Sequence, residues 1–266
     1  MIRAGVMGWP VEHSRSPVLH RFWLRQHGID GDYSLLPVPP EGLAMALRAL
    51  PQCGFAGCNL TLPHKEAALA IVDEVDAVAR RIGAINTIVV KPDGALEGRN
   101  TDIFGFLANL QLTEPGWRAA TGPAVVLGAG GGARAVAAAL ADAGVAEIRV
   151  VNRNRERALA LAAALGAPLR IVDWADRDNA LAGAALLVNT TSLGMAGQPS
   201  LALALDALPG TAVVYDIVPV PPMTQLLVAA RARGDYASAD SIRDTLEDTG
   251  VAVDDTTEGP RWELKR

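Results

Sequence analysis

Residue types that often carry metal or redox chemistry are scarce in this 266-residue chain. It has two cysteines, Cys53 and Cys58, and they are not spaced as in a redox Cys-x-x-Cys motif or a zinc ribbon. The four histidines form no His-x-x-x-His pair that could hold a metal ion on one helix face. The sequence therefore predicts free thiols and no metal site.

The chain also lacks an excess of basic residues and any long apolar run. Its 24 lysines and arginines face 29 acidic residues, for a net charge of -5, so no strongly basic surface is available to bind a phosphate polymer. No apolar run approaches the ~18 residues that span a bilayer. The apolar start, Ile2 to Met7, is interrupted at Gly8 and Pro10. We expect a cytoplasmic protein with no nucleic-acid partner and no membrane partner.

What the sequence does contain is a regular alternation of strand-like and helix-like segments, which predicts an α/β fold. The expected strands of the first part are 2–7, 33–38, 57–62 and 84–90, and its expected helices are 18–27, 41–50, 65–71 and 103–110. Four further apolar runs, near 124, 148, 185 and 212, are separated by alanine-rich segments. We predict an open, mostly parallel α/β domain over 1–112 and a doubly wound Rossmann-type domain over 113–234, joined at a turn-rich passage.

A glycine cluster directly follows the apolar run Ala124 to Leu127 and opens a probable helix. Such a turn between a strand and a helix lets a pyrophosphate approach the free backbone N–H groups at the helix start. An ordinary strand-to-helix turn is the alternative, but the flanking pattern favours a dinucleotide site. The predicted cofactor-binding residues of this loop are Gly128, Ala129, Gly130, Gly131, Gly132 and Ala133.

The residues after the next strand indicate which dinucleotide binds. An acidic residue at this place holds the ribose 2′-hydroxyl in NAD enzymes, but here Asn152 is neutral. Arg153 and Arg157 supply permanently charged, planar donors that suit a 2′-phosphate, so the sequence predicts NADP. The alternative is that these arginines only solvate a helix start.

Polar side chains gather where several predicted strands of the first domain end. Open α/β sheets bind ligands at that edge. Hydroxyl, amide, amine and carboxylate groups together suit a small carboxylated polyol, although Ser14 and Ser16 alone would be an ordinary turn. The predicted residues of this site are Ser14, Ser16, Thr61, Lys65, Asn86 and Asp102.

Several motifs in a fixed order closely resemble the shikimate dehydrogenase family. They are Gly-Trp-Pro-Val-Glu-His-Ser-Arg-Ser-Pro, Asn-Leu-Thr-Leu-Pro-His-Lys, Gly-Ala-Ile-Asn-Thr, Gly-Arg-Asn-Thr-Asp, Gly-Ala-Gly-Gly-Gly-Ala-Arg, Val-Asn-Arg and Asn-Thr-Thr-Ser-Leu-Gly-Met. The resemblance runs from about residue 5 to about residue 234. It implies an NADP-dependent oxidoreductase that interconverts 3-dehydroshikimate and shikimate, a step toward chorismate and the aromatic amino acids.

The resemblance also assigns roles to individual residues. Ser14 and Ser16 would hold the substrate carboxylate, and Thr61, Asn86 and Asp102 would engage ring hydroxyls. Lys65 would transfer the proton, because an alcohol that loses hydride from carbon must also lose a proton from oxygen. Asp102 would orient Lys65; the alternative for this lysine is an ordinary surface residue at a helix start. Four residues that would lie along the cofactor are Thr190, Thr191, Ser192 and Met195.

Ile217 would line the nicotinamide pocket, although a purely packing role is equally compatible with the sequence. Beyond Val218 the resemblance weakens, and the tyrosine that usually follows is absent. The family normally ends with a substrate-binding glutamine and an apolar helix that returns to the first domain. Residues 235–266 instead form a divergent acidic segment with turn formers, for which we expect weak packing. Part of this segment is a candidate addition to the first domain.

Three functional alternatives stay open at this point. Quinate and aminoshikimate dehydrogenases share the chemistry and differ in one ring substituent of the substrate. A catalytically silent, ligand-binding paralogue is the third, because the altered end of the chain removes expected contacts and kinship of fold does not guarantee chemistry. The sequence also leaves the oligomeric state undecided, with a homodimer as one alternative.

Overall fold

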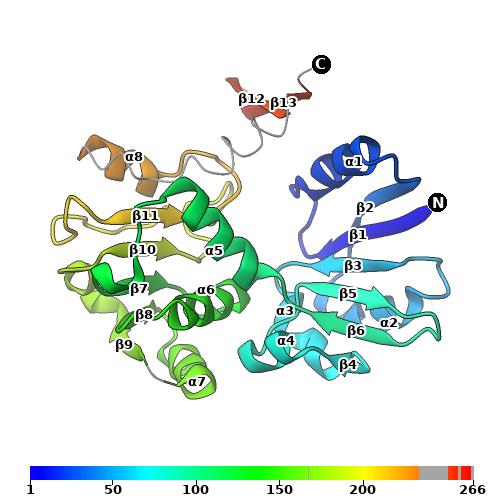
Figure 1. The fold of residues 1–266 in the computed structure, drawn as a ribbon, viewed down its shortest axis with the longest axis horizontal. Coiled ribbons are helices and arrows are strands. Elements are labelled where there is room, and N and C mark those ends of the chain that lie inside the picture. Colours follow the sequence, from blue (N-terminus) through cyan, green and yellow to red (C-terminus); the bar gives the residue numbers. More distant parts are fainter. Residues whose placement is uncertain (167, 234–250, 257–258, 265–266) are drawn as a thin grey trace. The chain divides into compact units, whose positions relative to one another are not determined.

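The computed structural model describes residues 1–166, 168–233, 251–256 and 259–264. It divides the chain into two compact units, Met1–Asp102 and Ile103–Arg266 (Figure 1). Each unit contains its own sheet and its own hydrophobic core. The predicted α/β class with two domains is confirmed.

The first unit is built on a six-stranded sheet with the order β2-β1-β3-β5-β6-β4. Its strands are β1 (Ile2–Gly8), β2 (Gly31–Pro37), β3 (Gly57–Leu60), β4 (Glu74–Val75), β5 (Thr87–Val90) and β6 (Leu96–Arg99). Its helices are α1 (Ser16–Gln26), α2 (Leu43–Ala49), α3 (His64–Ala67) and α4 (Ala77–Ile82), with short 3-10 turns at Pro40–Gly42 and Ala68–Ala70. The sequence analysis missed β4, α4 and β6, which are short.

The first sheet is mostly parallel, as expected, and β5 is the one strand of its six that runs in the opposite direction. β1 pairs in parallel with both β2 and β3, but β5 runs antiparallel to β3 and to β6. Because no long crossover helix separates β5 from β6, the two strands form a hairpin, which requires the antiparallel direction. The start of β5 therefore lies at the same edge of the sheet as the carboxyl ends of β3 and β6.

The second unit contains a five-stranded, fully parallel sheet with the order β11-β10-β7-β8-β9. Its strands are β7 (Ala124–Leu127), β8 (Ile148–Asn152), β9 (Leu169–Asp173), β10 (Leu186–Asn189) and β11 (Val213–Asp216). Its helices are α5 (Asp102–Thr113), α6 (Gly131–Asp142), α7 (Arg155–Leu165) and α8 (Gln225–Ala232), with 3-10 turns at Ala119–Thr121, Trp174–Asp176 and Asn179–Leu181. The strand order reverses between β7 and β10, which is where doubly wound sheets bind ligands.

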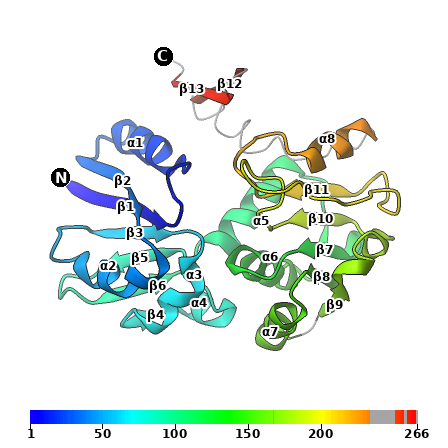
Figure 2. The same cartoon turned by 180° about the vertical axis from the view of Figure 1, so that it is seen from behind.

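Both faces of the second sheet are covered (Figures 1 and 2). Alternate residues of β7, such as Val125 and Val126, belong to two different hydrophobic clusters, one on each face. Phe106 and Leu110 of α5 pack into one of these clusters, which explains why the division between the units falls after Asp102. The sequence analysis placed this junction later, between 112 and 113, because it followed the turn-rich segment rather than the packing of α5.

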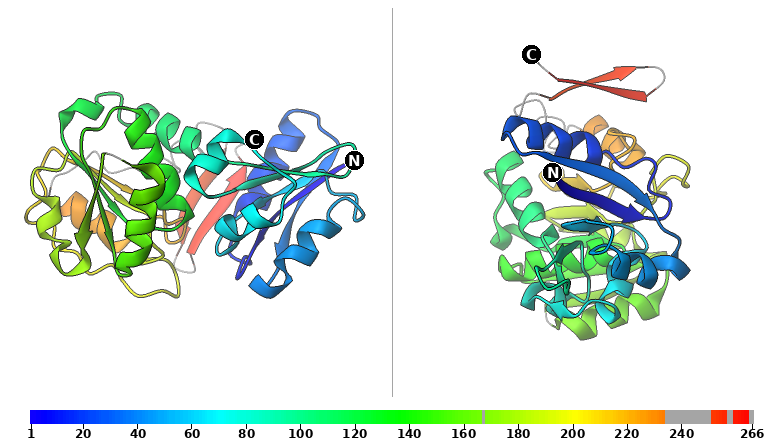
Figure 3. Two further views of the ribbon diagram at one scale, coloured as in Figure 1. Left: turned by 90° about the horizontal axis from the view of Figure 1, so that it is seen from below. Right: turned by 90° about the vertical axis from the view of Figure 1, so that its right-hand side faces the viewer.

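The final described strands are β12 (Val251–Thr256) and β13 (Gly259–Leu264), which pair in the antiparallel direction (Figure 3). Asp254, Asp255 and Thr256, which are frequent turn formers, belong to β12 here. The expectation for residues 235–250 lies outside the described residues. Among the described helices, none combines the length and the apolar character needed to cross a bilayer.

Candidate active site

A lysine–aspartate pair stands at the sheet edge of the first unit. Lys65 lies in α3, just after β3, and Asp102 is the first residue of α5, just after β6. The Lys65 Nζ donates to Asp102 Oδ2 at 2.6 Å, and the two side chains are 19% and 29% exposed. A charge-assisted bond of this length between partly buried groups fixes the position of the amine.

Asn86 connects this pair to the neighbouring strands. Its Nδ2 donates to Asp102 Oδ1 at 2.7 Å and to Thr101 Oγ1 at 2.9 Å. Its Oδ1 accepts from the backbone N–H of Thr101 at 3.0 Å. The side chain is only 7% exposed, so its amide is held in one orientation with both ends satisfied.

The local sequence explains how Asp102 reaches this position. Asn100, 7% exposed, donates to the carbonyl of Ala84 at 3.0 Å and accepts from the backbone N–H of Asp102 at 2.8 Å. This turn starts α5 at Asp102, where the positive end of the helix dipole stabilises a carboxylate. The prediction that Lys65, Asn86 and Asp102 lie together is confirmed by these contacts.

The other predicted substrate residues lie in loops that start from the same sheet. Ser14 Oγ donates to Ser16 Oγ at 3.1 Å and accepts from the backbone N–H of Ser16 at 3.3 Å, in the loop between β1 and α1. Thr61 follows β3, and its N–H donates to the carbonyl of Met7 at 2.9 Å. A Cβ atom on Gly8 would stand 2.3 Å from Thr61 Cγ2, so a glycine is required where the β1 loop passes this threonine.

The glycine loop of the second unit has the form that a dinucleotide needs. Gly128 follows β7 with a φ of +116°, and a Cβ there would stand 2.5 Å from Thr190 Oγ1. Gly130 precedes the first residue of α6, where a Cβ would meet no atom closer than Arg157 Nη2 at 4.0 Å. This backbone is open to a phosphate group, and the free N–H groups of α6 follow it. Gly131 and Ala133 are buried, as is Ala129.

The loop after β10 lies beside the glycine loop. Thr190 Oγ1 donates to the carbonyl of Leu127 at 2.6 Å, which joins the ends of β7 and β10 at the reversal of strand order. Thr191 Oγ1 donates to Asn189 Oδ1 at 2.8 Å. A Cβ on Gly132 would stand 3.0 Å from Ile217 Cδ1, so Ile217 packs against the start of α6. Ser192 and Met195 are half-buried in the same loop.

A buried polar cluster supports this second loop, and the sequence analysis did not single it out. Asp216 accepts from Asn189 Nδ2 at 3.0 Å and from Thr224 Oγ1 at 2.7 Å. Burial raises the pKa of Asp216, which these hydrogen bonds only partly offset. The signal that could have revealed the cluster is the placement of Asn189 and Asp216 at the ends of neighbouring apolar runs.

The predicted residues for the 2′-phosphate lie around the start of α7. Asn152 ends β8, and its Nδ2 donates to the carbonyl of Asn154 at 2.7 Å. Asn154 caps α7 by accepting from the N–H of Arg157 at 3.0 Å. Arg153 and Arg157 are exposed, as donors to a bound phosphate must be. Within the described ranges, no three His, Cys, Asp or Glu side chains gather as a candidate metal site.

Comparison with known proteins agrees with this geometry. Residues 6–88 match the profile of the shikimate dehydrogenase substrate-binding domain, and residues 113–196 match that of shikimate/quinate 5-dehydrogenase. The shikimate dehydrogenase (NADP(+)) of Paramagnetospirillum magneticum is 63% identical over 231 residues, which are 87% of this chain and 84% of that protein. The chain belongs to the shikimate dehydrogenase family. The predicted family membership is thus confirmed.

Solved structures of this family have the same fold. The shikimate 5-dehydrogenase of Thermus thermophilus in complex with NADP(H) and shikimate is 43% identical, with a TM-score of 0.77 over 88% of this chain and 85% of that one. The quinate dehydrogenase of Corynebacterium glutamicum in complex with NAD is 32% identical, with a TM-score of 0.82 over 94% and 91% of the two chains. The family therefore includes relatives that use different substrates and different dinucleotides.

Proposed function

We propose that this chain catalyses the reversible, NADP-dependent reduction of 3-dehydroshikimate to shikimate. The observation that carries the proposal is the Lys65–Asp102 pair, held at 2.6 Å at the sheet edge of a shikimate dehydrogenase fold. The predicted oxidoreductase class and the predicted NADP cofactor agree with the names of the relatives. Bound NADP would supply the hydride acceptor for the alcohol carbon.

The residues of the first unit would transfer the proton and bind the substrate ring. Lys65 would take the hydroxyl proton as the alcohol is oxidised and return it in the reverse reaction. Asp102 and Asn86 would fix Lys65 and engage ring hydroxyls, since the amide and the carboxylate lie within one bonded cluster. Ser14, Ser16 and Thr61 would hold the rest of the substrate, with the two serine hydroxyls donating to its carboxylate.

The residues of the second unit would hold the cofactor. The open backbone at Gly130 and the start of α6 suit the pyrophosphate, and Arg157 near Gly130 suits a phosphate as well. Arg153 and Arg157 would together bind the 2′-phosphate that distinguishes NADP from NAD. Thr190, Thr191, Ser192, Met195 and Ile217 would line the cofactor along the loops after β10 and β11.

Three further points belong to the proposal. The first unit, residues 1–102, would serve as the substrate domain, and residues 103–234 of the second unit would serve as the cofactor domain. We propose a cytoplasmic location, as the sequence analysis expected, and cell fractionation would test it. A homodimer is the assembly to test first, since closed twofold pairs are the commonest protein oligomers; sedimentation would decide it.

The direct test follows the absorbance of the reduced cofactor, NADPH or NADH, with purified protein. Shikimate, quinate and aminoshikimate are each offered with NADP and with NAD, which gives six pairs of substrate and cofactor. We expect the highest kcat/KM for shikimate with NADP. A higher kcat/KM for quinate would assign the chain to quinate dehydrogenases, and no turnover with any pair would favour a silent ligand-binding paralogue.

A further inference from the structure

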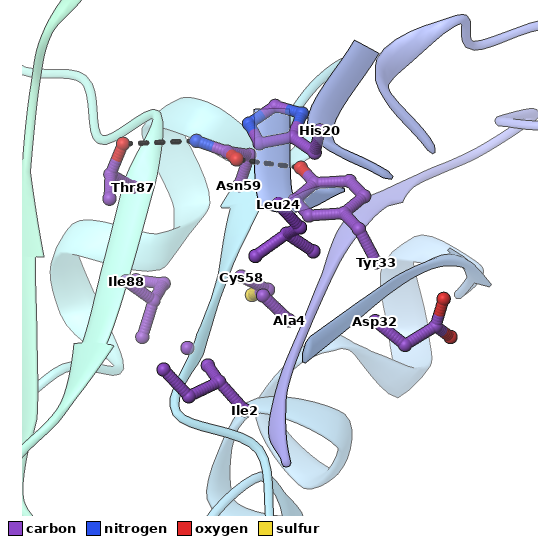
Figure 4. Close-up of a pocket in the computed structure, with 11 residues that line it drawn as sticks. Ile2, Ala4, His20, Leu24, Asp32, Tyr33, Cys58, Asn59, Thr87 and Ile88 are labelled. Atoms are coloured by element: carbon purple, nitrogen blue, oxygen red, sulfur yellow. Dashed lines mark hydrogen bonds between the residues drawn. The ribbon is translucent and has the colours of Figure 1, made fainter. Parts of the chain in front are cut away.

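A network of hydrogen bonds leads from the lysine–aspartate pair to a buried tyrosine on the edge strand β2. Tyr33 of β2 is 3% exposed, and its hydroxyl donates to Asn59 Oδ1 at 2.6 Å (Figure 4). Asn59 Nδ2 donates to Thr87 Oγ1 at 3.1 Å. Thr87 Oγ1 in turn donates to Asn86 Oδ1 at 2.8 Å, and Asn86 holds Asp102.

Groups that can only donate or only accept determine the direction of every hydrogen bond in this network. Asn59 Nδ2 also donates to the backbone carbonyl of Asn86 at 3.3 Å, which can only accept, so Asn59 Oδ1 must face Tyr33. The carboxylate of Asp102 can only accept, and the N–H of Thr101 can only donate, so the amide of Asn86 is oriented as well. The hydroxyl of Thr87 is left with a single arrangement: it accepts from Asn59 and donates to Asn86.

The tyrosine itself is held in place by packing. The ring of His20, from α1, stacks on the ring of Tyr33 with 3.9 Å between centroids and 12° between planes. Tyr33 and Asn59 line a cavity of about 230 Å³ whose other walls include Ile2, Leu24 and Ile88 (Figure 4). Burial also raises the pKa of Tyr33, which keeps the hydroxyl proton available as a donor.

We propose that Tyr33 is a positioning residue for the reaction, acting through Asn59, Thr87 and Asn86 on Asp102 and Lys65. Without the Tyr33 hydroxyl, Asn59 Oδ1 loses its donor, and the amide and the Thr87 hydroxyl gain alternative orientations. Asn86 then holds Asp102 less strictly, although every group that touches substrate is unchanged. This inference rests on the proposed function for its kinetic effect. The coupling between Tyr33 and Asn86 through the hydrogen bonds can be measured without turnover.

The first experiment measures that coupling in the full chain without ligands. With 15N-labelled asparagine, the side-chain amide signal of Asn86 is identified by its loss in an Asn86→Ser variant. We expect Tyr33→Phe to shift this signal and Ser34→Ala to leave it unchanged. Ser34 is the matched control, because it is the next residue of β2 and its hydroxyl donates to Asp32 at 3.1 Å instead. An Asn86 signal that does not move in Tyr33→Phe would overturn the proposal.

The second experiment is a double-mutant cycle on turnover. We expect Tyr33→Phe and Thr87→Val each to lower kcat about 3- to 10-fold, the effect of losing one hydrogen bond, with the KM for NADP within about twofold of its original value. Because the two residues act in series, the double variant should be no slower than the slower single variant. If the two reductions in kcat multiply in the double variant, Tyr33 and Thr87 act independently, and the proposed action in series is wrong. If Tyr33→Phe shifts the Asn86 signal but the protein shows no turnover with any substrate, the coupling is supported and the proposed function is wrong.

Discussion

Replacing Gly128 with alanine should weaken both the second unit and its binding of NADP. The new Cβ would meet Thr190 Oγ1 at 2.5 Å, and the φ of +116° is one that alanine rarely adopts. The backbone strain costs about 1–3 kcal/mol. Displacing Thr190 breaks its 2.6 Å hydrogen bond to Leu127, which costs about 1 kcal/mol more. We therefore expect unfolding to be easier by about 2–4 kcal/mol.

The matched control is Gly144→Ala. Gly144 has a φ of +90°, and a Cβ there would meet nothing within 4 Å, so this variant carries the backbone strain without the collision. Urea denaturation gives the free energy of unfolding for each variant, and quenching or enhancement of NADPH fluorescence gives Kd. Only Gly128→Ala should raise Kd, by about tenfold or more, which corresponds to about 1.4 kcal/mol. If both variants lose the same unfolding free energy and leave Kd unchanged, the contact of the new Cβ with Thr190 has no effect and our reasoning is wrong.

Three further changes test the roles proposed for residues of the first and of the second unit. Lys65→Ala should lower kcat by about 10²- to 10⁴-fold, which is the usual contribution of a general acid or base. The affinity for shikimate, measured by calorimetry, should be nearly unchanged. If turnover is unchanged, Lys65 takes no part in the reaction. Arg153→Ala combined with Arg157→Ala should raise the KM for NADP at least about tenfold and leave that for NAD nearly unchanged, since only NADP carries the 2′-phosphate; equal losses would point to a general role. Burial raises the pKa of Asp216 above its ordinary 3.8, so its contribution to stability is largest below pH 3.8 and is lost as the pH rises through the raised value. As the pH rises from acid to neutral, the original protein should therefore lose stability relative to Asp216→Asn, which has no titrating group at position 216. Urea titrations at several pH values measure the difference in unfolding free energy, and a difference that does not vary with pH would contradict this assignment.

Much of the second unit could be predicted because its signals are local. The run Ala124–Leu127, the glycines after it and the alanine-rich helix are consecutive in the sequence, so the strand, phosphate loop and helix follow from neighbouring residues. The capping of α7 by Asn154 is likewise a property of one short segment. The family motifs add residues whose chemistry is specific enough to be recognised without knowing the fold.

The sequence by itself determined the alternation of strands and helices, the phosphate loop and the types of polar residue offered to a substrate. Only the tertiary structure decided that β5 runs antiparallel to β3, which places Thr87 opposite Asn59, and that Asn86 hydrogen-bonds Asp102 directly. It also decided that α5 packs with the second unit and that Tyr33 reaches Asn59. The physical reason is that strand direction and sheet order depend on pairing between segments distant in the chain, and no local pattern of residues records that pairing.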